Sequence, residues 1–198
     1  KEKGVKMVFI DPFHNYTAAA MGGKWLAPRI GTDTALALAI AHVWITEGSY
    51  AKDYVRDRTV GFDAFRDYVL GKEDGEPKTP AGAAQQSGIE ARTIKALARE
   101  WASKRTVLSA GARGGEGGAC RQAFATEWAR MMVLLQAMQG LGKPGASIWG
   151  TSMGAPVDAS VWFPGYGDLQ GRMSTSSAAR RIPENPVAQR LYRPILPD

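Results

Sequence analysis

The sequence has very little cysteine, and Cys120 is the only one among its 198 residues. A single thiol excludes an internal disulfide, a CxxC metal site and an iron–sulfur cluster held by cysteines of this sequence. Long apolar runs are also missing, and none approaches the ~18 residues that a membrane-spanning helix needs. We therefore expect no membrane-spanning segment in this sequence.

Dense basic blocks and the common nucleotide-binding loops are absent as well. The formal net charge is +6, and Lys and Arg are scattered along the chain. This distribution argues against a nucleic-acid partner and is compatible with a phosphate-bearing ligand. No glycine loop ends in the Gly-Lys-Ser/Thr of a P-loop, and no clean Gly-x-Gly-x-x-Gly precedes an acidic residue ~20 positions on, so a nicotinamide enzyme has little support.

The most informative stretch begins with six mostly apolar residues, 5–10, followed by Asp11-Pro12. We predict a buried parallel strand here, ended by Pro12, which has no backbone N–H and biases the preceding residue away from helix. Asp11 would then lie at the carboxyl end of a strand, where open α/β sheets bind ligands. A second polar tip, Gly31-Thr32-Asp33, precedes a predicted helix at 34–47, and we expect both tips to converge on one polar ligand.

Asp33 has two interpretations. Thr32 or Asp33 can supply the N-cap of helix 34–47, and capping together with the helix dipole fully explains a carboxylate at this position. Alternatively, the Asp33 carboxylate accepts paired N–H donors from a base edge like that of guanine. The spacing alone favours the cap. His14 likewise either contacts a ligand or lies in a solvated loop.

Hydrophobic periodicity and turn residues predict the scaffold around these tips. Residues 24–30 are expected to be extended because Pro28 discourages helix, and Gly48 is expected to end helix 34–47. Pro80 fits the first position of a helix. Four further scaffold helices are predicted at 50–58, 62–70, 81–87 and 90–103.

A second informative region follows a β-type run at 106–110. Residues 111–118 contain five glycines, which let the backbone approach a ligand, and Arg113 and Arg121 can engage phosphate or carboxylate. The alternative is a flexible loop with solvated arginines. A helix predicted over 121–139 carries one apolar face that is typical of a core: Phe124, Trp128, Met131, Met132, Leu135 and Met138.

The ends of the sequence suggest a domain cut from a longer protein. The chain opens on Lys-Glu-Lys-Gly directly before the first predicted strand, and residues 169–198 carry four prolines and little periodicity. We expect an α/β domain over residues 1–150 and an irregular Pro/Gly-rich, loop-rich extension over residues 151–198.

Taken in order, the motifs of residues 5–150 resemble the molybdopterin oxidoreductase family, the dimethyl-sulfoxide-reductase type of molybdenum or tungsten enzymes. The glycine run at 113–118 and the segment 127–130 look most similar to the branch of pyrogallol–phloroglucinol transhydroxylase and related catechol dehydroxylases. The motifs that carry the resemblance are Ile10-Asp11-Pro12, Thr17-Ala18-Ala19-Ala20, Trp25, Pro28, Gly31-Thr32-Asp33-Thr34-Ala35-Leu36, Thr59-Val60-Gly61-Phe62, Ser87-Gly88-Ile89, Thr93-Ile94-Lys95-Ala96-Leu97-Ala98 and Gly140-Leu141-Gly142-Lys143-Pro144-Gly145.

The resemblance implies an α/β fold with a Rossmann-like parallel sheet flanked by helices. It also implies a cofactor, bis-molybdopterin guanine dinucleotide with molybdenum or tungsten, of which this segment grips one guanine dinucleotide. The guanine would then meet Asp33, which overturns the preference for a pure cap and leaves capping to Thr32. The glycine loop departs from the common family pattern, so its register is less well fixed. The implied cofactor-binding residues are Asp11, Pro12, Phe13, Thr32, Asp33, Gly111, Arg113, Gly114 and Glu116.

The resemblance further implies that this chain supplies only one face of the cofactor site. The family's metal ligand and cluster domain come from other parts of the chain, so no residue here is expected to be catalytic or to bind metal, and family order argues against Cys120. The expected partners are the remaining domains of the same enzyme and an iron–sulfur electron-transfer subunit, in the cytoplasm. The isolated segment should be inactive. The rival interpretation is a stand-alone nucleotide-binding or interaction module without metal chemistry.

Overall fold

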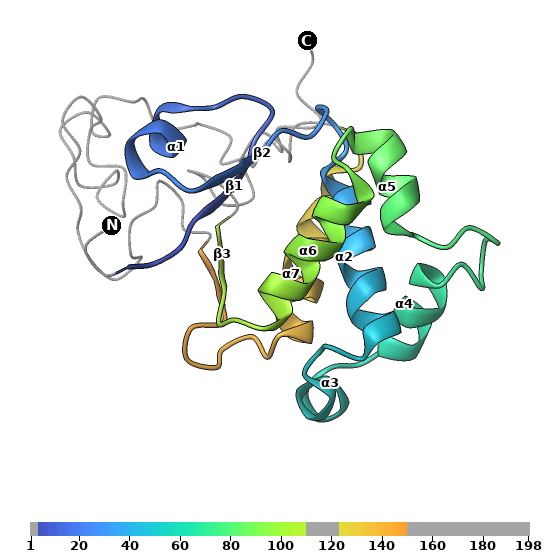
Figure 1. Ribbon diagram of the computed structural model, residues 1–198. Helices are drawn as coiled ribbons and strands as arrows, with labels where there is room; N and C mark the ends of the chain where they lie inside the picture. The colour runs from blue at the N-terminus through green and yellow to red at the C-terminus, as the bar shows by residue number, and fades with distance from the viewer. Residues whose placement is uncertain (1–3, 110–122, 150–198) are drawn as a thin grey trace, which may run out of the picture. The chain divides into compact units, whose positions relative to one another are not determined.

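The computed structural model describes residues 4–109 and 123–149 (Figure 1). The chain divides into two units, residues 1–154 and 155–198, and all described residues belong to the first. The predicted extension over 151–198 and the glycine loop therefore lie outside the described residues. Within the described part, two small parallel sheets accompany a group of helices.

The first sheet pairs strands β1 (Val8–Ile10) and β2 (Lys24–Leu26) in parallel, with Phe9 opposite Trp25. The short helix α1 (Tyr16–Met21) connects them. Gly23 allows the connection to close, because its φ is +133° and a Cβ there would lie 2.5 Å from the carbonyl oxygen of Met7. The chain thus builds a parallel pair from the two segments predicted to be extended.

The prediction that residues 5–10 form a buried strand is wrong in two respects. Pairing begins only at Val8, and the side chains of Val8 and Ile10 are each 38% exposed. A parallel strand becomes fully buried only when neighbouring strands and helices cover both of its faces. Here the described sheet offers β1 a single partner strand and one short helix, which is too little cover.

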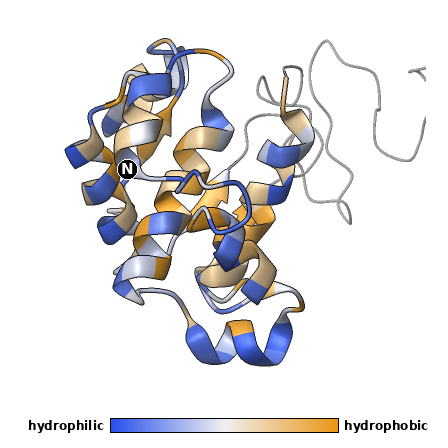
Figure 2. Cartoon of the chain, turned by 90° about the vertical axis from the view of Figure 1, so that its right-hand side faces the viewer, coloured by the Kyte–Doolittle hydropathy of each residue, from blue (hydrophilic) through white to orange (hydrophobic). Residues whose placement is uncertain are grey.

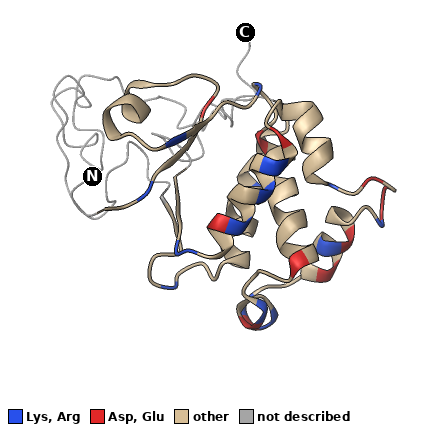
Figure 3. Ribbon diagram, in the orientation of Figure 1, with Lys and Arg blue, Asp and Glu red and all other residues tan. Residues whose placement is uncertain are grey.

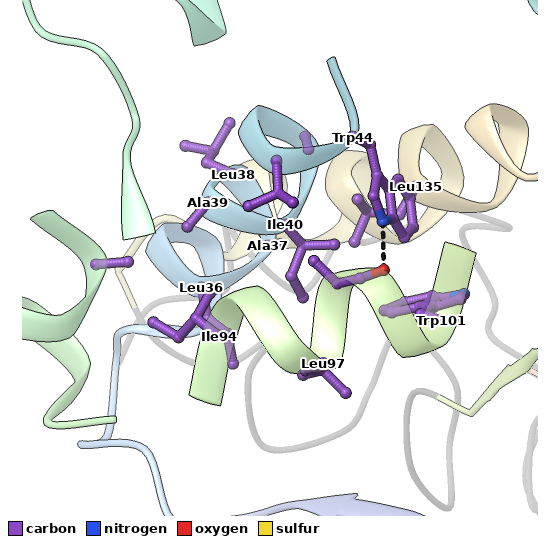
Figure 4. Close-up of a cluster of buried hydrophobic side chains, with 14 of the residues drawn as sticks. Leu36, Ala37, Leu38, Ala39, Ile40, Trp44, Ile94, Leu97, Trp101 and Leu135 are labelled. Atoms are coloured by element: carbon purple, nitrogen blue, oxygen red, sulfur yellow. Dashed lines mark hydrogen bonds between the residues drawn. The ribbon is translucent and has the colours of Figure 1, made fainter. Parts of the chain in front are cut away.

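Helix α2 (Asp33–Glu47) forms the centre of the helical part, and α4, α5, α6 and α7 all pack against it (Figure 1). Its sequence is apolar nearly all round, which is the pattern of a helix surrounded by neighbours. Trp44 is fully buried, donates its indole N–H to the Ala98 carbonyl at 2.7 Å and packs edge-on against Trp101 (Figure 4). The predicted stop at Gly48 is confirmed, because Gly48 adopts the left-handed conformation with φ +63°.

The other helices put their apolar residues toward this centre and their polar residues outward (Figure 2). The predicted stripe on α6 is confirmed, since Ile94, Leu97, Ala98 and Trp101 are all buried. The predicted first-turn proline is also confirmed, with Thr79 accepting a cap hydrogen bond from Gly82 N–H just before it. The helices are α3 (Lys52–Arg58), α4 (Phe62–Val69), α5 (Pro80–Ser87), α6 (Ala91–Ala102) and α7 (Ala125–Met138).

The predicted face of α7 is right except at its first residue. Trp128, Met131, Leu135 and Met138 are buried as expected. Phe124 instead precedes the helix as its N-cap, with a positive φ of 62° and 68% of its surface exposed. The apolar periodicity of the sequence begins one turn before the helix does. Periodicity does not show that Phe124 adopts a left-handed backbone conformation, which keeps it out of the helix.

The second sheet pairs β3 (Val107–Ser109) and β4 (Ser147–Trp149) in parallel. Gln136 of α7, fully buried, donates from Nε2 to the carbonyls of Thr106 and Ser147, each at 2.9 Å. One side chain therefore ties the beginnings of both strands to α7. Among the residues that the structure describes, the two sheets stay separate two-stranded units, so an α/β arrangement is observed and the Rossmann-like sheet remains a prediction.

Candidate functional site

The carboxyl end of β1 is fixed in place by hydrogen bonds to β2. The Asp11 N–H donates to the Leu26 carbonyl at 3.1 Å, and the Trp25 indole N–H donates to the Asp11 carbonyl at 2.9 Å. Both backbone polar groups of Asp11 are thereby used by the neighbouring strand. The residue predicted to form the first polar tip is held rigidly where the strand ends.

The Asp11 carboxylate organises the loop that follows. Its Oδ1 accepts the Phe13 N–H and its Oδ2 accepts the Asn15 side-chain amide, both at 3.0 Å. Asn15 in turn caps α1 by accepting the Ala18 N–H at 2.9 Å. Each carboxylate oxygen has a second lone pair and can still accept another donor. Asp11 is thus first a brace for the loop, with capacity left for a ligand.

An aromatic surface lies beside this brace. Phe13 is 64% exposed, Trp25 is 42% exposed and Tyr16 is 94% exposed. His14 packs edge-on against Trp25, with ring centroids 5.2 Å apart. Large exposed rings on the β1–α1 loop and the neighbouring strand are typical of surfaces that contact a flat ligand or another protein part. His14 thus lies exposed in a loop, with Trp25 as its neighbour, and its contact with a ligand stays a prediction.

The second polar tip lies at the beginning of α2. Thr32 occupies the N-cap position, as expected, but its hydroxyl donates to the Arg29 carbonyl at 2.6 Å and makes no side-chain cap hydrogen bond. Thr32 is therefore the cap by position and not by hydrogen bonding. Asp33 is half-buried in the first turn, where the positive end of the helix dipole stabilises a carboxylate.

Arg29 anchors the segment between the two tips, and the sequence did not reveal this role. Its N–H donates to the Ser87 carbonyl, and its guanidinium donates to the Gln85 carbonyl, both at 2.9 Å. These carbonyls belong to the last turn of α5, where a cation is favoured. The contact spans 56 residues of sequence, so only the folded chain shows it. The guanidinium also packs over Gly88, whose Cβ would lie 3.6 Å from Arg29 Nε.

The glycine-rich run follows β3 in the sequence, after the last described residue of that strand, Ser109. Its predicted residues Gly111, Arg113, Gly114 and Glu116 lie outside the described residues, as does Cys120. The chain re-enters the described part at residue 123, and the Phe124 carbonyl there accepts the Thr34 hydroxyl at 3.4 Å. Thr34 stands in the first turn of α2, so the exit of this loop lies beside the Thr32–Asp33 tip.

The predicted site residues thus fall into separate groups. The structure brings Asp11, Pro12 and Phe13 together through the Asp11 brace, and it brings the beginning of α2 next to the loop exit at Phe124. Strand β2 and the Arg29 anchor connect the two groups. Among the residues that the structure describes, no cluster of His, Cys, Asp and Glu suits a metal ion, and no helix is long and apolar enough to cross a bilayer.

The sequence of this chain is similar to those of known proteins. The sequence pattern of the molybdopterin oxidoreductase family matches residues 1–180. The large subunit of pyrogallol hydroxytransferase from Pelobacter acidigallici is 51% identical over 180 residues, which is 90% of this chain and 21% of that protein. The dimethyl sulfoxide/trimethylamine N-oxide reductase of Rhodobacter capsulatus is 42% identical over 105 residues, which is 53% of this chain and 13% of that protein.

A solved structure is similar as well. Acetylene hydratase from Pelobacter acetylenicus matches 73% of this chain and 18% of its own, with a TM-score of 0.63 and 28% identity. The chain therefore spans about a fifth or less of the length of these relatives.

Proposed function

The chain belongs to the molybdopterin oxidoreductase family, and we propose that it is the segment that grips the guanine end of one molybdopterin guanine dinucleotide. The cofactor, when bound, supplies the metal-centred redox or group-transfer chemistry of a molybdenum or tungsten enzyme. The residues of this chain bind and orient it and do not react. The observation that carries the proposal is the arrangement of Asp33 at the beginning of α2 with the Arg29 anchor and the Asp11 brace.

The donor and acceptor chemistry of the two tips fits such a ligand. A guanine edge offers adjacent N–H donors, and the half-buried Asp33 carboxylate is a two-oxygen acceptor that can pair with them. The exposed rings of Phe13 and Trp25 are suited to cover a flat heterocycle or the neighbouring chain. Pro12, Phe13 and Thr32 would then line the nucleotide beside the two acids. The glycine-loop residues Gly111, Arg113, Gly114 and Glu116 stay predictions for the pterin side.

For the parent enzyme we propose hydroxyl transfer on polyhydroxylated aromatic substrates. This rests on the 51% identity to pyrogallol hydroxytransferase, which extends over 90% of the chain. The reductases of sulfoxides and N-oxides are a second candidate, because one is 42% identical over 105 residues. The shorter extent of that match makes reduction the less favoured reaction. A stand-alone nucleotide-binding module is disfavoured because the family pattern covers residues 1–180.

We further propose that the partners are the remaining domains of the same enzyme and a separate iron–sulfur subunit. The remaining domains are inferred because this chain spans only 21% of the length of the hydroxytransferase relative. The separate subunit is inferred because that relative is described as a large subunit. The cytoplasmic location expected from the sequence is kept as part of this proposal.

The test is the replacement Asp33→Asn in the full-length parent enzyme. Asn keeps the size of the side chain but replaces one acceptor oxygen with a donor, which opposes the N–H groups of guanine. A hydrogen bond to a charged group contributes about 1.5–3 kcal/mol, so cofactor affinity should fall about 10- to 150-fold. Metal content, and GMP released by acid hydrolysis, should fall together at limiting cofactor supply.

Asp63→Asn is the matched control, because Asp63 is an exposed acid in the first turn of α4 that pairs with Arg66. It changes the same group at the beginning of another helix and should leave GMP content unchanged. Unfolding curves of both variants separate a folding defect from a binding defect. Unchanged GMP and metal content in Asp33→Asn, with the fold intact, would show that the guanine role is wrong.

A further inference from the structure

A hollow of about 540 Å³ lies where three helices end, away from the residues of the proposed cofactor site. Its walls are the turns that follow α2, α6 and α7. The first turn is held against the third by a hydrogen bond of 2.7 Å from the Ala51 N–H to the Met138 carbonyl. The polar and charged side chains that line the hollow include Ser49, Lys104, Arg105, Gln139 and Lys143.

The charge of this hollow has one sign. Lys104, Arg105 and Lys143 line it, and none of the described lining residues is acidic. These three cations form no ion pair within the described part of the chain, where the salt bridges are made by residues of α2–α6 and the loops beside them. Figure 3 shows basic positions in the loop before β3 and in the loop before β4. Like charges around one hollow repel, and an anion between them removes that repulsion.

Two residues that line the hollow carry buried donor atoms without a hydrogen-bond partner. Ser49 Oγ and Gln139 Nε2 are inaccessible to solvent and make no hydrogen bond among the described residues. A buried polar atom without a partner is costly and rare in folded proteins. Both residues are among those that line the hollow, so each unpaired donor lies in its wall.

Free carbonyls at the helix ends explain these cations only in part. A basic residue after a helix is often explained by the free carbonyls of the last turn. Here turn N–H groups already donate to those carbonyls at each of the three ends. The bonds run from Gly48 to Ile45, Ser49 to Trp44, Ser103 to Arg99, Lys104 to Trp101, Gln139 to Gln136 and Gly140 to Ala137.

We propose that this hollow binds an oxyanion, a phosphate or carboxylate group, between Lys104, Arg105 and Lys143, with Ser49 and Gln139 as donors. Its volume is in the range of small-molecule sites. The group comes either from a free small molecule or from an acidic side chain in another part of the parent enzyme. Neither source needs the molybdenum cofactor, so a test of this anion site does not depend on whether the proposed function is right.

The test uses calorimetric titration of the full chain with pyrophosphate and with citrate in low-salt buffer. We expect binding at millimolar concentration or tighter, weakened by added salt. The combined variant Lys104→Gln, Arg105→Gln, Lys143→Gln should weaken it at least about tenfold. The matched control replaces three ion-paired cations elsewhere, Arg56→Gln, Lys72→Gln and Arg92→Gln, and should change it less than twofold.

Two single variants separate a built site from general electrostatic attraction. Ser49→Ala and Gln139→Met keep every charge and remove one donor each, and each should weaken binding severalfold. The parent enzyme then identifies the source. Binding there as well indicates a free anion, and binding by the chain but not by the parent indicates an acidic side chain that fills the hollow. No binding by the chain, or equal loss in the charge control, overturns the proposal.

Discussion

Gln136 allows the sharpest test of how the second sheet is held. Its side chain is fully buried, and its amide donates to the Thr106 and Ser147 carbonyls at 2.9 Å each. These two acceptors lie at the beginnings of β3 and β4, so one amide joins both strands to α7. The replacement Gln136→Met keeps the length and volume of the side chain and removes only the hydrogen bonds.

The expected loss follows from the atoms left without partners. Each buried carbonyl that loses its donor costs about 1–3 kcal/mol, and the half-buried positions of Thr106 and Ser147 favour the lower end, about 2 kcal/mol for the pair. Gln136 Oε1 is itself buried without a described partner, and its removal gives back about 1 kcal/mol. The free energy of unfolding should therefore fall by about 1 kcal/mol. Gln136→Glu should lose more, because a carboxylate would face two carbonyl oxygens.

Urea unfolding followed by circular dichroism measures the difference in the free energy of unfolding. Gln139→Met is the matched control: it is the same replacement three residues later, at a side chain whose Nε2 makes no hydrogen bond in the described part of the chain. In buffer without multivalent anions, Gln139→Met should leave the free energy of unfolding unchanged or raise it slightly. Hydrogen exchange should also speed up in residues 107–109 and 147–149 of Gln136→Met. If the two variants have the same free energy of unfolding, the hydrogen bonds of Gln136 do not stabilise the second sheet and the reasoning is wrong.

Three further outcomes are expected from the same structure. Trp44→Phe loses the indole hydrogen bond and leaves a buried carbonyl without a donor, so its free energy of unfolding should drop by about 1–3 kcal/mol in urea. Gly71→Ala should destabilise by more than about 2 kcal/mol, because its φ is +75° and a Cβ would lie 2.4 Å from Pro77 N; thermal melting checks this. Burial and Lys95 lower the pKa of His42 below its ordinary 6.5. The unfolded chain then binds the proton first, so stability falls as the pH drops below about 6.5, and His42→Gln should flatten that part of the curve.

The helices could be predicted because their signals are local. Apolar periodicity, Gly48 after α2 and Pro80 at the beginning of α5 each act within a few residues, and each is observed where expected. The family resemblance is confirmed by the matched pattern over residues 1–180. The similarity to the hydroxytransferase branch is matched by the 51% identity to one of its members.

Two of the misses depend on contacts between distant parts of the chain. The exposure of Val8 and Ile10 depends on how many strands join β1, which the six residues themselves do not encode. The Arg29 anchor joins residues 56 positions apart, and an isolated Arg in an extended segment gives no sign of its partner. Thr32 takes the N-cap position, but its hydroxyl donates to the Arg29 carbonyl three residues earlier and accepts no cap hydrogen bond, and a residue type alone does not distinguish these two local arrangements.

The Arg29 anchor limits where this fold can change its length during evolution. Residues 27–31 run from the end of β2 to α2, and the guanidinium fastens their middle to the last turn of α5. An insertion there would shift Asp33 relative to Asp11 and pull the cation off its carbonyls. The exposed loop after α4, around Glu73, has no such attachment to the two acids and can lengthen without moving either. Relatives that bind the same ligand should therefore vary in length between α4 and α5 and keep the spacing between β2 and α2.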